Sequence, residues 1–173
     1  MAPSRLSDDL VQHPHLTTAG LLMEAVAGFG SRLERQLEQQ QLSTQWFELL
    51  IRLLRTPGHR LRMSDLAAQT TLTASGLTRA VDRLEAAGLV RREACPSDRR
   101  GSFAVLTDAG ETRISTAVAP HVEELCEVFD GHYSAAELET FTELLRRLRD
   151  AVNPAAACGS TGAECDEAEA SAP

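Results

Sequence analysis

The chain has 173 residues and a formal net charge of −8, with 43% hydrophobic and 24% charged residues, which is typical of one folded domain. No apolar run approaches the roughly 20 residues that span a bilayer. The first 15 residues also lack the apolar core of a secretory signal. The four cysteines form no CxxC pair, so neither a disulfide scaffold nor a zinc finger is indicated. We therefore expect a cytoplasmic protein.

The charge is distributed unevenly along the chain. Residues 52–100 contain ten arginines and five acidic residues, a local net charge of +5, whereas the rest of the chain sums to −13. The end of the chain adds acidic residues without a base, namely Glu164, Asp166, Glu167 and Glu169. A basic segment within an acidic protein is the pattern of a local phosphate-binding surface.

The first half of the chain predicts an arm and two helices. Residues 1–15 are polar and contain proline, so we expect a loose arm. A helix is predicted over about 17–41, with one apolar stripe formed by Leu22, Val26, Phe29, Leu33 and Leu37. A second helix, over 44–55, is apolar nearly all round and should lie in the centre of the core. Pro57-Gly58 should end it.

Residues 64–88 predict a pair of helices joined by a tight turn. Ser64 is a candidate N-cap of the first, and the second follows Thr73 and runs to Ala87, where Gly88 supplies the stop. Its core-facing positions are Leu77, Val81 and Leu84, spaced by four and three residues. The charged and hydroxyl side chains of this helix should therefore face away from the core.

Two short strands follow, LVRREA and SFAVLT, separated by the polar loop CPSDRRG, which suits a hairpin. A helix is then expected over about 108–130, bent at Pro120. Ser134 and Glu137 form a capping box for a last helix, whose seam consists of Leu138, Phe141, Leu145, Leu148 and Val152. Residues 154–173 should be a disordered acidic tail.

This order predicts a mainly α fold with a small β-hairpin wing, a winged helix-turn-helix. In such folds the N-terminal half of the second helix reads base edges in the major groove. Arg79 can pair with guanine through two hydrogen bonds, whereas Arg83 and Arg99 suit phosphates. The predicted major-groove residues are Thr73, Ser75, Gly76, Thr78 and Arg79. The ordinary alternative is the solvated face of an amphipathic helix.

The tip of the hairpin carries a second candidate contact. An arginine on a narrow hairpin fits the minor groove, where the potential is most negative. We assign this role to Arg100 and a holding role to Asp98. The alternative is an exposed turn with a surface ion pair worth less than about 1 kcal/mol.

The segment SGLTRAVDRLEAAGLVRR, followed by D-R-R-G and L-T-x-x-G, resembles the DNA-binding lobe of the MarR family of bacterial transcription regulators. The order of flanking helices extends the resemblance to residues 16–153, with the lobe at about 44–107. The resemblance implies a homodimer built by the first, fifth and sixth helices, binding a pseudopalindromic operator. It also implies wing contacts by Asp98 and Arg100. Two recognition helices would then lie roughly 34 Å apart, one DNA turn.

The family resemblance also implies control by a small anionic or aromatic effector, by thiol oxidation or by a metal. Candidate pocket residues are His15, Trp46 and Phe47, although a core tryptophan and a loose histidine are the plainer interpretation. Cys95 neighbours Arg91 and Arg92, a setting that lowers the pKa of a thiol. Cys126 is expected to be an ordinary packed thiol. The spacing of His121, Cys126 and His132 does not favour a metal site, so no metal or other cofactor is expected.

We therefore expect a sequence-specific DNA-binding regulator, a repressor, released from double-stranded DNA by a small effector. The alternatives are a winged-helix protein-interaction module without DNA binding, and a regulator under thiol-redox control through Cys95. An enzyme is not expected, because the chain shows no paired carboxylates, nucleophile–base set or phosphate loop at useful spacing.

Overall fold

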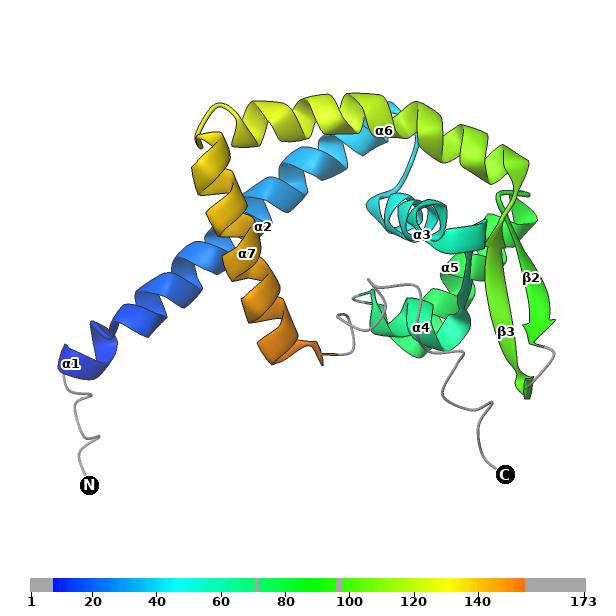
Figure 1. Ribbon diagram of the computed structural model, residues 1–173, viewed down its shortest axis with the longest axis horizontal. Coiled ribbons are helices and arrows are strands. Elements are labelled where there is room, and N and C mark those ends of the chain that lie inside the picture. Colours follow the sequence, from blue (N-terminus) through cyan, green and yellow to red (C-terminus); the bar gives the residue numbers. More distant parts are fainter. Residues whose placement is uncertain (1–7, 71, 96–97, 155–173) are drawn as a thin grey trace, which may run out of the picture.

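The computed structural model describes residues 8–70, 72–95 and 98–154, with the side chains of residues 8–9 and 98–100 excepted. Figure 1 shows two parts joined by a long helix: α2 and α7 lie on one side, and α3, α4, α5 and the sheet lie on the other, with α6 running across both. None of the helices described is long and apolar enough to cross a membrane. The elements are α1 (Asp8–Val11), α2 (Pro14–Gln39), α3 (Thr44–Arg55), a 3₁₀ turn (Pro57–His59), β1 (Arg60–Arg62), α4 (Met63–Ala68), α5 (Ala74–Ala86), β2 (Val90–Cys95), β3 (Asp98–Leu106), α6 (Asp108–Phe129) and α7 (Ala135–Val152).

The beginning of the described chain is more ordered than the expected loose arm over residues 1–15. One turn of helix, α1, is followed directly by α2, which begins at Pro14 rather than at Thr17. Proline is favoured at the first helical position because its missing N–H would have no partner there. The His13 side chain caps the helix by accepting a hydrogen bond from the backbone N–H of His15 (3.2 Å). Residues 1–7 lie outside the described part.

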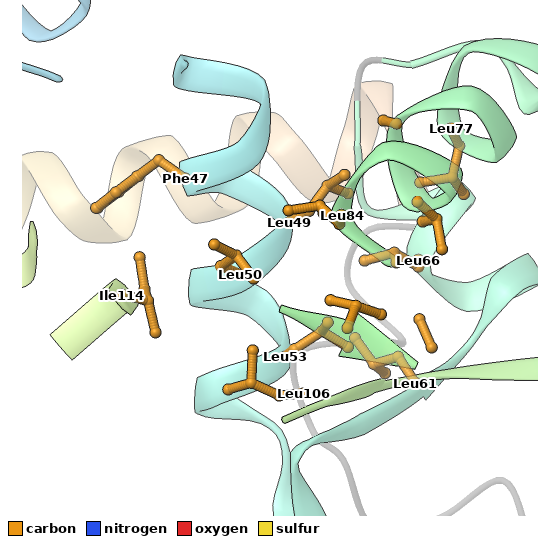
Figure 2. Packing of buried hydrophobic residues seen from close by; sticks show 14 of the residues in the cluster. Phe47, Leu49, Leu50, Leu53, Leu61, Leu66, Leu77, Leu84, Leu106 and Ile114 are labelled. Carbon is orange, nitrogen blue, oxygen red and sulfur yellow. The ribbon is translucent and has the colours of Figure 1, made fainter. Parts of the chain in front are cut away.

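The core of the lobe is built around α3, whose bounds are those predicted. Ser43 caps it by accepting from the backbone N–H of Trp46. Figure 2 shows the α3 leucines surrounded by side chains of α4, α5, α6 and the sheet. Leu49 and Leu50 are fully buried, and Leu53 nearly so. The prediction that this helix is central is confirmed.

The predicted helix pair corresponds to α4 and α5. The three core-facing residues of α5, Leu77, Val81 and Leu84, are all buried, as predicted. The predicted N-cap Ser64 is wrong: α4 begins at Met63, and Ser64 lies inside it with its hydroxyl donating to Asp65 Oδ1 (3.1 Å). The reason is that strand β1 leads straight into α4, so the chain enters the helix without a capping side chain.

The sheet has three antiparallel strands in the order β1-β3-β2. The hairpin β2–β3 is the predicted one, whereas β1 was not predicted because its sequence, Arg-Leu-Arg, shows only one apolar residue. Leu61 is buried in the core. The guanidinium groups of Arg60 and Arg62 lie over the ring of Phe103, at 4.1 and 5.6 Å from its centroid.

A tight joint connects the lobe to α6. Thr107 caps α6 by accepting from the N–H of Gly110 (3.0 Å), and its hydroxyl donates to the carbonyl of Gly88 (2.7 Å). The backbone N–H of Thr107 donates to the carbonyl of Leu89 (3.1 Å). A Cβ on Gly110 would overlap that same carbonyl oxygen and would lie 2.8 Å from a methyl carbon of Leu106. The L-T-x-x-G motif therefore fixes the direction in which α6 leaves the lobe.

Helix α6 continues without interruption through Pro120 and is gently arched in Figure 1. It contacts both α2 and α3. Arg32 on α2 pairs with Glu124 and Glu127 on α6 (2.7 Å to Glu127), and Phe29 contacts Phe129. Pro120, where a bend was predicted, does not interrupt α6, so the helix acts as one connector.

A buried histidine lies where α2, α3 and α6 meet. His121 on α6 is 9% exposed, with Nδ1 3.1 Å from Gln36 Oε1 and its ring 4.2 Å from that of Phe47. Burial lowers the pKa of His121, and the charge of Glu124 opposes this shift.

The last helix, α7, begins with the predicted capping box between Ser134 and Glu137. The hydrogen bonds from the Ser134 hydroxyl and backbone lower the pKa of Glu137. No residue of α7 is buried within the single chain. The C-terminal part of its predicted seam is exposed, at Leu145, Leu148 and Val152.

We predict that Gly110→Ala lowers the free energy of unfolding by about 3 kcal/mol, because the new methyl group collides with backbone that cannot move aside cheaply. Urea denaturation at fixed protein concentration measures this. Gly28→Ala is the control: a methyl group there would meet no packed neighbour within 4 Å, so alanine in α2 should be neutral or stabilise by up to about 1 kcal/mol. Equal effects of the two substitutions would contradict the tight packing of this joint.

We also predict acid sensitivity from His121. Because its folded-state pKa is lowered, the folded protein binds this proton less tightly than the unfolded chain. The contribution of His121 is therefore complete above the unfolded pKa of about 6.5 and is lost as the pH falls through the folded pKa. Urea denaturation between about pH 7.5 and about pH 5 should show a steeper loss of stability for the wild type than for His121→Asn. Parallel curves would refute this role.

Candidate nucleic-acid interface

The N-terminus of α5 is organised by Thr73. Its hydroxyl accepts a hydrogen bond from the backbone N–H of Gly76 (3.2 Å) and lies 3.4 Å from Ser75 Oγ. A Cβ on Gly76 would lie only 3.1 Å from the Thr73 hydroxyl, so a larger residue would crowd the cap. The sequence therefore places Gly76 where the helix start needs space, and Ser75 is exposed beside it.

The outer face of α5 carries the remaining predicted base-reading residues. Thr78 and Arg79 are both exposed, on the side opposite the buried Leu77 and Val81. The Thr78 hydroxyl donates to the carbonyl of Ala74 (2.9 Å), and Arg79 Nε donates to the carbonyl of Ser75 (3.2 Å). The structure thus brings all five predicted major-groove residues to one end and one face of a single helix.

Arg83 extends this face by one turn. Its Nε donates to the carbonyl of Arg79 (3.3 Å), and its Nη2 donates to Gln45 Oε1 at the start of α3 (3.2 Å). Arg83 is exposed. The contact with Gln45 orients its guanidinium along the boundary between α5 and α3, next to the residues predicted to read bases.

A further residue, Arg92 of β2, was considered from the sequence only as a neighbour of Cys95. Its Nη1 contacts Asp82 Oδ1 (2.5 Å) and Glu85 Oε2 (3.1 Å), and its Nη2 donates to the carbonyl of Thr78 (3.3 Å). Its backbone N–H donates to Glu85 Oε1 (2.9 Å). The sequence feature that could have indicated this contact is the pair Asp82 and Glu85, three residues apart on the polar face of α5. Two neighbouring carboxylates favour a cationic partner.

The predicted wing is the hairpin β2–β3. Its register is regular from Val90↔Leu106 to Ala94↔Ser102 and then shifts, so that Cys95 faces Asp98. The side chains of Asp98, Arg99 and Arg100 lie outside the described part, so the predicted minor-groove and phosphate contacts stay predictions.

The predicted effector residues are not brought together within one chain. Phe47 is buried in the core against His121, and Trp46 is partly buried at the start of α3. His15 is exposed at the N-terminal end of α2, whereas α3 follows the C-terminal end of that helix. The His15 ring centroid lies 4.8 Å from that of His13. The 26 residues of α2 correspond to about 39 Å of helix.

The two described cysteines differ from expectation. Cys95 is 5% exposed, and the neighbouring guanidinium groups are engaged elsewhere, Arg91 with Glu93 and Arg92 with α5. Cys126, expected to be packed, is exposed in the single chain. Desolvation raises the pKa of the Cys126 thiol, and Asp130 and Glu123 raise it further. A raised pKa favours the less reactive thiol form.

Comparison with known proteins identifies the family. A model of the MarR family matches residues 40–101, which run from just before α3 to the first part of β3. Transcriptional regulator HosA of Escherichia coli O111:H- is 39% identical over 79 residues, 46% of this chain and 58% of that protein. The chain thus spans little more than half the length of this curated relative.

The likeness to solved structures covers more of the chain. Sco3205 of Streptomyces coelicolor, a MarR family transcriptional regulator crystallised in complex with DNA, is 32% identical, with a TM-score of 0.75 over 83% of this chain and 94% of that one. AbsC, another MarR family transcriptional regulator from the same organism, is also 32% identical, with a TM-score of 0.66 over 86% and 97%. Because both relatives are 32% identical over more than four fifths of the chain and nearly all of their own length, the chain belongs to the MarR family of transcriptional regulators.

Proposed function

We propose that this chain is a sequence-specific transcriptional regulator, a repressor, that binds a pseudopalindromic double-stranded DNA operator in the cytoplasm as a homodimer. The observation that carries the proposal is the outer face of α5. Hydroxyl groups and the Arg79 guanidinium lie together on its exposed N-terminal half, while the opposite face is locked into the core. This is the chemistry that hydrogen-bonds base edges in the major groove.

The local charge supports the same function. Although the whole chain is acidic, the segment that contains α5 and β2 is basic. Arg83 continues the exposed face beyond the base-reading residues, at the distance of one helical turn, and suits a DNA phosphate. Phosphate contacts set register and supply affinity, whereas base contacts supply sequence preference. The relative Sco3205, crystallised with DNA, supports this assignment.

The proposed homodimer rests on apolar surface that one chain leaves uncovered. Large apolar side chains of α1, α2 and α7 are 39–73% exposed, among them Leu16, Leu21, Met23, Val26, Leu145, Leu148 and Val152. A helix such as α7, with no buried residue, gains little from packing in the monomer. Burying these faces in a two-fold interface would stabilise it and would set the distance between two copies of α5.

Control by an effector stays a prediction. We propose a small anionic or aromatic ligand near the junction of α2, α3 and α6, where Trp46 and Phe47 lie, with His15 able to contribute only from a second chain. Redox control through Cys95 is less well supported, because this thiol is buried and its arginine neighbours are paired with carboxylates.

The salt dependence of DNA binding tests the proposal. A duplex is first selected from a random-sequence library by the wild-type protein, and its affinity is measured by mobility shift over a range of salt concentrations. A dimer that neutralises several phosphates should lose affinity steeply, with log K falling in proportion to log salt at about −0.9 per phosphate. Selection of no sequence, or a salt-independent complex, would contradict DNA regulation.

Arg79→Ala tests the base-reading role of α5. The variant should bind the selected duplex more weakly by about 1–3 kcal/mol per half-site and should accept other bases at one position of each half-site. Repeating the selection with the variant measures both effects. Arg35→Ala, which removes an exposed arginine of α2 outside the lobe, is the charge-matched control. An unchanged selected sequence for Arg79→Ala would remove this residue from the base-reading set.

A further inference from the structure

Arg92 connects β2, a strand of the predicted wing, to α5, the helix predicted to read bases (the recognition helix). It lies on β2, the edge strand next to β3, and its side chain reaches across to α5. Two carboxylates and one backbone carbonyl of α5 accept hydrogen bonds from its guanidinium. A planar guanidinium with several fixed donors suits such a multipoint contact better than an ammonium group does.

The residues that Arg92 contacts lie close to the predicted base-reading residues. Thr78, whose carbonyl accepts from Arg92 Nη2, is itself one of those residues. Asp82 lies one helical turn further along α5, and Glu85 follows three residues later. A shift of β2 relative to α5 would therefore move the middle of the recognition helix, not only its end.

The negative charges of Asp82 and Glu85 oppose the approach of α5 to DNA. Asp82 and Glu85 are 53% and 40% exposed on the same helix that must approach DNA phosphates. Negative side chains near phosphates are repelled at a distance comparable with the Debye length. The guanidinium of Arg92 lies against both carboxylates and is itself only 28% exposed. It therefore offsets their charge locally while keeping little surface of its own for a phosphate.

We propose that Arg92 is a positioning residue for sequence recognition: it neutralises Asp82 and Glu85 and fixes α5 against the wing strand. This inference rests on the proposed function and deepens it, since it concerns how the same helix discriminates between DNA sequences. Two other roles are distinguishable from it. Arg92 as a direct phosphate ligand would raise affinity for every sequence equally, and Arg92 as a stabiliser of the fold would leave discrimination intact.

The experiment compares affinity for two probes, the duplex selected by the wild-type protein and a shuffled duplex of the same composition. The variants are Arg92→Gln, the double variant Asp82→Asn/Glu85→Gln, and the triple variant that combines them. Arg91→Gln is the matched control, because it removes the same charge from the adjacent residue, whose partner Glu93 lies on the same strand. Thermal melting and the oligomeric state of each variant are measured in parallel.

Arg92→Gln should reduce the preference for the selected over the shuffled duplex by about tenfold, comparable with one mismatched base pair per site. Arg91→Gln should leave that preference within about twofold of the wild type. The triple variant should regain much of the affinity lost in Arg92→Gln, because the uncompensated carboxylates are gone. The double variant removes both carboxylate charges, while Arg92 keeps its hydrogen bond to the carbonyl of Thr78. It should bind the shuffled duplex more tightly and discriminate less, which tests the inference even if Arg92→Gln fails to fold.

Three results would overturn the inference. Equal losses on both duplexes, with a smaller salt slope and no recovery in the triple variant, would make Arg92 a phosphate ligand. A lower melting temperature with unchanged preference would make it a stabiliser only. An effect of Arg91→Gln as large as that of Arg92→Gln would make the loss a matter of general charge. A wild-type protein that selects no sequence would instead refute the proposed function itself.

Discussion

The burial of α3 is the constraint on which the rest of the structure depends. This helix contacts α2, α5, α6 and strands β1 and β3, and it contributes Leu49, Leu50 and Leu53 to the centre of the core. Full burial of one such side chain contributes about 1.5–3 kcal/mol. Every element that carries a candidate DNA contact is oriented by packing against this helix or against a neighbour of it. The position of α5, the proposed recognition helix, is thus decided by apolar residues buried in the core.

The joint between the lobe and α6 extends this control to the outer helices. Thr107 and Gly110 let the start of α6 approach the backbone of Gly88 and Leu89, directly after the end of α5. His121 and the Arg32 ion pairs then fix α6 against α2 and α3. A change in how α2 and α6 pack would therefore be expected to move α5, because the start of α6 is closely packed against the residues that follow α5. In the proposed homodimer, this arrangement would keep the two DNA-binding lobes at a set separation.

The sequence predicted the lobe well because its apolar residues repeat with clear helical periods and its helix ends carry standard caps. Thr73 and the capping box at Ser134 begin helices, and Gly88 follows the end of one with a positive φ, as their residue types predicted. The failures have the same origin. Ser64 has the chemistry of an N-cap, but tertiary structure draws Arg60–Arg62 into a strand and leaves the serine inside the helix.

Contacts between distant residues were the part that sequence patterns could not supply. Asp82 and Glu85 could be placed on the polar face of the predicted helix and Arg92 in the strand that follows, but the distances between them depend on how β2 packs beside α5. His15 and Trp46 lie apart within one chain for the same reason: they belong to different helices, α2 and α3, and the distance between them depends on how these helices pack. The seam of α7 is a different case: the helix and its capping box were predicted from the sequence, and Leu145, Leu148 and Val152 are exposed in the single chain.

The most direct test of the proposed pairing is a hydroxyl-radical footprint of the wild-type protein on its selected duplex. We predict two protected segments related by a two-fold axis, with half-site centres about one helical turn apart, 10 base pairs or so. Protein-to-DNA stoichiometry in the same complex should be two chains per duplex. A single asymmetric footprint made by one chain would contradict the proposed pairing of two α5 helices and, with it, the role assigned to the exposed faces of α2 and α7.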